Sequence, residues 1–128
     1  MFCGIDVIEV ERIKDAILAS SDFKTKVFTK KEIEDIDKCA EKIKYQRYAG
    51  RFAAKEAVYK AISQILVENN LSIEFNQIEV ENVGNLKRRP KVNILNVEID
   101  EILKDYTIDI SITHIEKIAS ASSIVSKK

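Results

Sequence analysis

The sequence is poor in the residues that build disulfide frameworks, zinc sites and flexible linkers. Its 128 residues include two cysteines (Cys3 and Cys39), one histidine, one proline and three glycines, and no tryptophan. Two cysteines cannot form the disulfide framework of a small secreted domain, and one histidine beside them leaves a His/Cys zinc site short of ligands. We therefore expect two reduced thiols. A hard, oxygen-ligated ion remains possible, because acidic residues are plentiful.

Long apolar runs are also missing. The apolar stretches, such as residues 65–67, are far shorter than the ~20 residues of a bilayer-spanning helix. Asp6 and Glu9 lie where a secretory signal would have its apolar core. We expect a cytoplasmic protein without a membrane segment. The chain has no linker, repeat or low-complexity segment, and its length fits one domain over residues 1–128.

No charge of one sign dominates the composition. The chain has 21 basic and 21 acidic residues, and its formal net charge is zero. Basic residues nevertheless gather between Lys38 and Lys60, where only Glu41 and Glu56 oppose them. Such an excess attracts anionic ligands, although most charge runs are solvated helix faces. Nucleic acid is not favoured as a partner, because the rest of the chain is acidic and lacks interleaved aromatics.

Hydrophobic periodicity predicts helices in the first half and mostly strands in the second. After an opening strand, helical spacing predicts a first helix over residues 10–18. A capping box marks the start of a second at residue 29, and an alanine-rich apolar face predicts a third over residues 45–67. Alternation and turn residues such as Gly84-Asn85 then predict strands around one short helix. The fold class is therefore α+β, with helices packed on a mostly antiparallel sheet. The predicted strands cover residues 3–10, 78–81, 91–94, 108–112 and 118–125, and the predicted helices 10–18, from 29, 45–67 and 97–103.

Three short segments contain residues with chemical potential. In the opening strand Ile5 and Val7 alternate with Asp6. That acid is costly to bury unless it is paired or bound to a metal, and the alternative is that it points to solvent. In the long helix Glu56 and Lys60 are four residues apart and lie in one row along the helix. Glu56 could be a metal ligand and Lys60 a phosphate contact, or the two could form a simple helix ion pair.

The third segment, residues 111–114, closes an alternating strand with the only histidine, His114. A lone histidine is usually structural or exposed. The hydroxyls of Ser111 and Thr113 project to one side of the strand and could donate to phosphate oxygens. None of the three segments establishes a reaction by itself.

Taken in this order, the segments resemble the holo-acyl-carrier-protein synthase family, the small type of phosphopantetheinyl transferase. The resemblance covers essentially the whole chain. Two positions depart from the family pattern: Phe2 replaces a glycine of many members, and Arg88-Arg89-Pro90 replaces a Gly-Lys-Pro turn. Neither departure removes a group that the chemistry requires. The matching motifs are Gly4 to Ile13, Phe28 to Glu32, Tyr48 to Lys60, Ile110 to His114 and Ala119 to Ala121.

The resemblance implies a 4'-phosphopantetheinyl transferase fold and a magnesium-dependent reaction in fatty acid biosynthesis. A serine hydroxyl of the acyl carrier protein attacks the coenzyme A phosphorus nearest the pantetheine, and adenosine 3',5'-bisphosphate leaves. Asp6 and Glu56 are implied to hold the magnesium ion, a cation that prefers few carboxylates plus phosphate and water. Lys60 stabilises the leaving phosphate or assists proton removal, and Glu56 or a metal-bound water are the alternative bases.

The same resemblance implies the remaining contacts and partners. Arg51 and His114 contact the phosphates or adenine region of coenzyme A, and Lys42 and Lys44 are further candidates for its 3'-phosphate. The family works as a homotrimer with active sites at subunit interfaces. The alternatives are a non-catalytic carrier-protein- or nucleotide-binding module of the same fold, or a broad-specificity transferase. The surface implied for the acidic carrier protein comprises Arg12, Lys14, Phe23, Lys24 and Lys26.

Overall fold

The computed structural model describes residues 1–83 and 89–128. The predicted turn at Gly84-Asn85 and the Arg88 departure lie outside the described residues. Within these ranges, no helix has both the length and the apolar character needed to cross a membrane. In chain order the elements are β1 (Phe2–Glu9), α1 (Val10–Ala19), α2 (Ser21–Val27), α3 (Lys30–Asp37), α4 (Glu41–Glu68), the 3-10 helix η1 (Phe75–Gln77), β2 (Ile78–Val83), β3 (Arg89–Ile94), α5 (Val97–Leu103), β4 (Tyr106–His114) and β5 (Ile118–Lys127).

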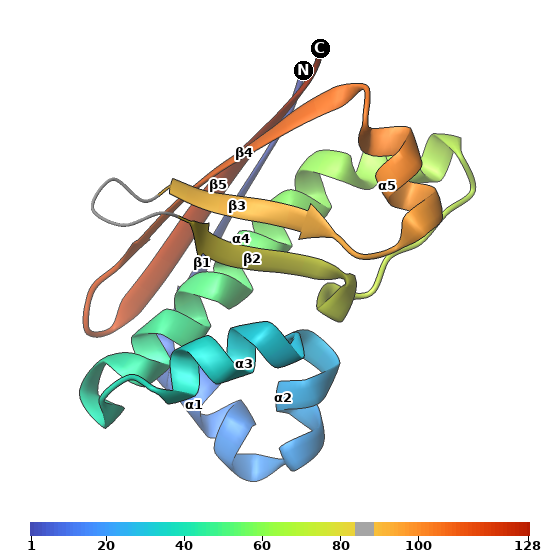
Figure 1. Cartoon of the computed structure of the whole chain (residues 1–128). Helices are drawn as coiled ribbons and strands as arrows, with labels where there is room; N and C mark the ends of the chain where they lie inside the picture. The colour runs from blue at the N-terminus through green and yellow to red at the C-terminus, as the bar shows by residue number, and fades with distance from the viewer. Residues whose placement is uncertain (84–88) are drawn as a thin grey trace.

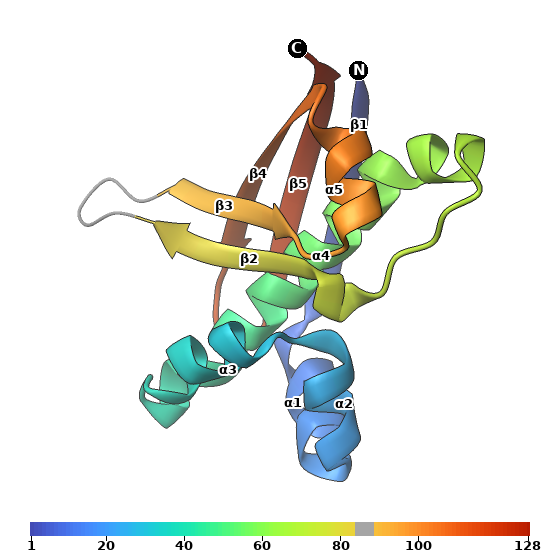
Figure 2. The ribbon, with the colours of Figure 1, turned by 45° about the vertical axis from the view of Figure 1, so that its right-hand side comes forward.

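The strands over the described ranges form two antiparallel sheets, not the single sheet predicted. Among the described strands, β5 lies between β1 and β4, and β2 pairs only with β3. Helix α4 runs along the three-stranded sheet and also contacts β2 (Figure 1). The β2–β3 hairpin runs across β4 rather than alongside it, so the two sheets share no ladder (Figure 2). The α+β class is confirmed, and the division into two sheets corrects the prediction.

Helix α4 is the central element, and alanine makes its packing possible. Ala53, Ala57 and Ala61 are buried against the sheet. Small side chains let a neighbouring backbone approach closely, which a helix of larger residues would prevent. The helix begins at Glu41, one turn before the predicted start. The start was predicted too late because the N-cap residue, Ala40, has no side chain that can make a capping hydrogen bond, so the sequence contains no capping signal there.

Strand β1 packs on α4 with the face that contains Gly4 and Asp6, and not with the more apolar face that contains Ile5 and Val7. Ile5 and Val7 are 65% and 61% exposed, whereas Gly4 is buried and Asp6 is half-buried on the opposite face. A methyl carbon at Gly4 would lie 2.0 Å from the Ala57 carbonyl oxygen. Only glycine permits this contact, so the Gly4 face must point inward, and Asp6 points inward with it.

The capping box predicted at the start of α3 is present. The Thr29 hydroxyl accepts a hydrogen bond from the Glu32 backbone nitrogen at 3.2 Å, and a Glu32 carboxylate oxygen accepts one from the Thr29 nitrogen at 2.8 Å. Such a box satisfies two of the backbone donors left free at a helix start. Glu32 is fully buried.

Candidate active site

Asp6, Glu56 and Lys60 come together where β1 crosses α4. The Lys60 ammonium nitrogen lies 3.5 Å from Asp6 Oδ1 and donates to the Ile5 carbonyl oxygen at 2.9 Å. Glu56 lies one helical turn before Lys60 on the same row of α4. The aspartate in the opening strand therefore faces the two helix residues with which the sequence grouped it, and the alternative of a solvent-facing Asp6 is wrong.

This cluster has more negative charge than its one lysine balances. The Asp6 Oδ2 atom is buried and has no hydrogen-bond partner among the described residues. Burial raises the pKa of Glu56, the Asp6 charge raises it further, and Lys60 opposes them. An unpaired buried oxygen and a carboxylate that resists ionisation both indicate space for a further cation.

The donor set fits a hard divalent ion. Over residues 1–83 and 89–128, no group of three or more His, Cys, Asp or Glu side chains is arranged to hold a metal. Two carboxylates are the usual protein contribution to a magnesium site, since magnesium keeps several waters and takes substrate phosphate oxygens. Asp6 and Glu56 would supply that contribution.

A second group lines a cavity of about 310 Å³ between α4, the β2–β3 hairpin and β4. His114 Nδ1 lies 2.9 Å from Gln46 Oε1, and burial, followed by the Arg47 charge, lowers the pKa of His114. Arg51 is buried and donates to the Val80 carbonyl oxygen at 2.7 Å. Two guanidinium groups beside a neutral imidazole suit an anionic, planar ligand. The lining residues are Arg47, Gly50, Arg51, Asn82, Pro90, Ile112 and His114.

Within one chain the two groups do not meet. Asp6 lies on β1 and His114 on β4, the opposite edges of the three-stranded sheet. On α4, Arg51 and Glu56 are five positions apart, which places them about 140° apart around the helix axis. A ligand that touches both groups therefore has to reach around α4 or bind between two copies of the chain.

Other predicted phosphate contacts lie elsewhere. Lys42 and Lys44 are in the first turn of α4 and do not line the cavity. Lys44 instead pairs with Glu41 at 3.5 Å. Ser111 and Thr113 are exposed on the face of β4 opposite His114, because alternate residues of a strand face opposite sides.

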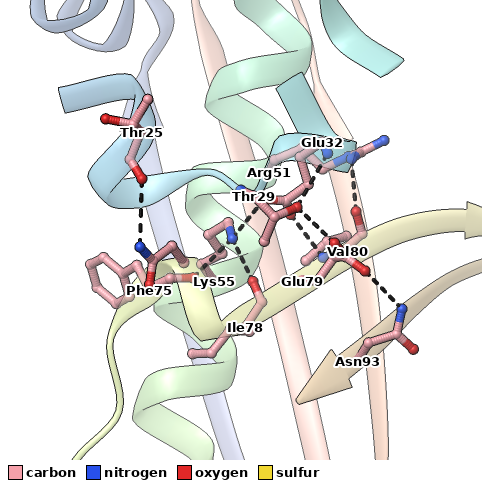
Figure 3. Close-up of polar contacts among 11 residues, drawn as sticks. Thr25, Thr29, Glu32, Arg51, Lys55, Phe75, Ile78, Glu79, Val80 and Asn93 are labelled. Carbon is pink, nitrogen blue, oxygen red and sulfur yellow. Dashed lines mark hydrogen bonds and ion pairs between the residues drawn. The ribbon is translucent and has the colours of Figure 1, made fainter. Parts of the chain in front are cut away.

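Two features of the site were not predicted from the sequence: Arg47 in the cavity wall and a buried ion pair that involves Glu32 and Lys55. Lys55 and Glu32, both fully buried, approach to 2.8 Å (Figure 3). The capping box located Glu32, and the Lys55-Glu56 motif located Lys55. Nothing in either pattern indicated that the two side chains meet, because they are 23 positions apart and the contact depends on how α3 packs on α4.

Comparison with known proteins assigns the chain to a family. The family model described as the 4'-phosphopantetheinyl transferase superfamily matches residues 2–118. The chain is 37% identical over 126 residues to the holo-[acyl-carrier-protein] synthase of Fusobacterium nucleatum, with 95% of each chain covered. It is 40% identical over 127 residues to that of Caldicellulosiruptor saccharolyticus, covering 98% of this chain and 95% of the relative.

Its fold is also similar to that of solved structures. One is the holo-[acyl-carrier-protein] synthase of Helicobacter pylori in complex with coenzyme A, with a TM-score of 0.74, 25% identity and coverage of 97% of this chain and 99% of that one. Matched residues 2–118 include Asp6, Glu56, Lys60, Arg51 and His114, so both groups of site residues lie inside the matched region. The chain therefore belongs to the 4'-phosphopantetheinyl transferase superfamily.

Proposed function

We propose that this protein catalyses the holo-acyl-carrier-protein synthase reaction in the cytoplasm, as a step in fatty acid biosynthesis. It transfers 4'-phosphopantetheine from coenzyme A to a serine of apo-acyl carrier protein and releases adenosine 3',5'-bisphosphate. The observation that carries the proposal is the cluster of Asp6, Glu56 and Lys60, with its unpartnered buried oxygen. It supplies two metal ligands and one phosphate-binding cation at one point of the surface.

Asp6 and Glu56 hold a magnesium ion in this proposal. When bound, the ion neutralises charge that develops on the pyrophosphate oxygens. Lys60 is half-exposed, so its flexible stem lets the ammonium move from the Ile5 carbonyl oxygen to a phosphate oxygen. There it stabilises the leaving phosphate or assists removal of the serine proton.

The nucleotide end of coenzyme A binds in the cavity around Arg47, Arg51 and His114. Arg51 directs one N–H toward the Val80 carbonyl oxygen, and its other guanidinium donors, which bond to no described residue, are proposed to contact phosphate. The His114 Nδ1 proton is directed to the Gln46 amide oxygen, which leaves Nε2 as an acceptor. These groups together recognise phosphate charge and a base edge.

A homotrimer brings the two groups of site residues together. They lie at opposite sheet edges in one chain, so the β1 edge of one copy has to face the cavity of a neighbour. The face of the sheet that points away from α4 has several exposed apolar side chains. A group of exposed apolar side chains is typical of a protein interface. These residues are Ile5, Val7, Ile118 and Ile124, between 43% and 65% exposed.

The carrier protein docks on the surface formed by α1 and α2. Phe23 on α2 stacks on Phe52 of α4, with ring centroids 6.4 Å apart, and is half-buried. This apolar anchor lies one turn of α4 from Glu56. Lys26 is exposed beside it, and Lys14 lies over the Tyr45 ring. Basic side chains around an apolar anchor suit an acidic partner.

Charge reversal tests this docking surface. The double variant Lys14→Glu, Lys26→Glu should raise the Michaelis constant for carrier protein and leave that for coenzyme A nearly unchanged. Exposed charges act over roughly 10 Å at 0.1 M salt, so the effect should shrink as salt is added. Equal weakening of both substrates would show that the two basic surfaces are one site.

One assay tests the proposed function directly. The protein is incubated with apo-carrier protein, coenzyme A and magnesium, and the mass of the carrier is followed. Addition of one phosphopantetheine group, stopped by chelator and restored by magnesium or manganese, is the expected result. Carrier binding without any gain in mass would instead favour the non-catalytic module.

A further inference from the structure

The buried Lys55 is fully satisfied by acceptors from three separate elements. Its ammonium pairs with Glu32 Oε1 of α3 at 2.8 Å and donates to the carbonyl oxygen of Phe75 in η1 at 2.9 Å. It also donates to the carbonyl oxygen of Ile78 at the start of β2 (Figure 3). An ammonium has three donors, so three oxygen acceptors use all of them, and the charged form fits the site.

Glu32 is equally well satisfied. Besides Lys55, Oε1 accepts from the Thr29 backbone nitrogen at 2.8 Å, and Oε2 accepts from the Val80 backbone nitrogen at 2.8 Å. A buried ion pair is tolerated when its remaining hydrogen-bonding capacity is met, and removal of one partner leaves an uncompensated charge. The Glu32–Lys55 pair therefore holds α3, α4 and β2 together.

These side chains cover the edge of β2 opposite β3, with which no strand of residues 1–83 and 89–128 pairs. The amide and carbonyl of Val80 are bonded to Glu32 and Arg51, and the carbonyl of Ile78 is bonded to Lys55. They point away from β3, because all three groups are bonded to helix side chains. An uncovered edge would leave these backbone groups unpaired in the interior. The charged groups thus fix β2 against the helices as a neighbouring strand would.

The same edge continues into the proposed nucleotide cavity. Asn82, two residues after Val80, lines the cavity, and Pro90 lines it from β3. The opposite walls come from α4 and β4. The distance between the hairpin and α4 therefore sets the width of the cavity.

We propose that Glu32 and Lys55 are positioning residues that hold the β2–β3 hairpin at the distance from α4 required by the nucleotide end of coenzyme A. The inference rests on the proposed function for the identity of the ligand. It assigns no contact with substrate to Lys55, although Lys55 lies next to Glu56 in the sequence. A displaced hairpin weakens nucleotide binding and leaves the Asp6–Glu56 cluster in place.

The test variant is Glu32→Gln, which keeps the shape but presents an amide NH₂ to backbone or lysine donors. Two measurements apply: hydrogen exchange of the Val80 amide and the dissociation constant for adenosine 3',5'-bisphosphate by calorimetry. We expect exchange in β2 to accelerate selectively and the dissociation constant to rise about tenfold. The Michaelis constant for coenzyme A should rise by a similar factor, with a smaller change in kcat.

Two control variants separate positioning from general loss of stability. Val125→Ala removes buried volume on β5, a strand that pairs with β1 and β4 and not with the hairpin, and should lower the melting temperature without changing bisphosphate affinity. Lys31→Gln removes the exposed 2.8 Å pair with Glu81, which connects α3 and β2 at the surface, and should change neither measurement. If Glu32→Gln does not fold, the double variant with Lys55→Met leaves no unpaired charge and should show the same loss of affinity.

The outcomes are distinct. Wild-type affinity in both Glu32 variants would overturn the proposal, as would a loss in Val125→Ala as large as in Glu32→Gln. Unchanged exchange of the Val80 amide would also overturn it, because the hairpin would then be held by other contacts. If the wild-type protein neither binds the bisphosphate nor modifies carrier protein, the proposed function fails. The exchange result still decides separately whether the pair holds the hairpin.

Discussion

Replacement of Gly4 by alanine should separate β1 from α4 and misplace Asp6. The added methyl carbon would lie 2.0 Å from the Ala57 carbonyl oxygen and 3.0 Å from the Ala61 nitrogen. Real contacts of this kind are essentially never shorter than 3.0 Å, so the elements must move apart by at least the difference of about 1.0 Å. Because the obstacle is backbone of a buried helix, no flexible side chain can move aside.

Two magnitudes follow from that displacement. Overpacking of a close-packed core costs about 1–3 kcal/mol, which for a domain of this size lowers Tm by about 4–12 °C. Asp6 lies two residues along the same strand face and moves with Gly4. A misplacement of about 1 Å at a reacting centre can cost on the order of 100-fold in rate, so carrier modification should fall by that factor.

Thermal melting and the rate of carrier modification measure the two effects. The matched control is Cys3→Ala, because Cys3 is the neighbouring residue on the exposed face of the same strand. It should melt and react nearly as the wild type does. Gly4 has ordinary extended backbone that alanine also adopts, so backbone strain adds nothing. A Gly4→Ala protein with wild-type Tm and rate would refute the close-contact explanation for how Asp6 is placed.

Three further predictions concern metal, pH and assembly. Asp6→Asn and Glu56→Gln should each lower magnesium-dependent transfer by at least about 100-fold, the scale of losing one preorganised electrostatic group; full activity of the native protein in excess chelator would contradict this. The pKa of His114 is lower in the folded protein than its ordinary value of 6.5. As pH falls through 6.5, the unfolded chain therefore binds a proton on this histidine before the folded protein does, and folding becomes less favourable. Wild-type protein should therefore lose more stability between pH 7.5 and 5.5 than His114→Gln in melting experiments at each pH, and equal slopes would contradict the assignment. Light scattering should show a trimer for the wild type and for Val67→Glu, which alters a 71% exposed residue on α4, but a monomer for Ile124→Glu.

Local patterns in the sequence located most elements. The Thr29 and Glu32 capping box, the alternation at residues 108–112 and the spacing at residues 97–103 each led to the element that the structure contains. Helix α2 was not predicted, because only Phe23 and Val27 of its seven residues are apolar, and two positions do not establish a helical period. The second sheet was also missed, since alternation shows that a residue is in a strand but not which strand it pairs with.

Within the proposed site, the sequence grouped residues that are close along one element. Glu56 and Lys60 are four positions apart, so helix geometry alone placed them in one row. It did not decide the direction of Asp6, because Ile5 and Val7 on the other face are the more apolar pair. It did not indicate that Arg51 and His114 line a cavity away from Asp6, because that depends on the order of strands in the sheet.

The sequence by itself determined the class of fold and which side chains are available for chemistry, because both depend on residue type and on spacing over a few turns or strands. Tertiary structure decided which side chains meet. The Gly4 contact turns Asp6 toward Glu56, and the packing of α3 on α4 brings Glu32 to Lys55. Such contacts depend on distances between segments far apart in the chain, and short-range periodicity contains no information about those distances.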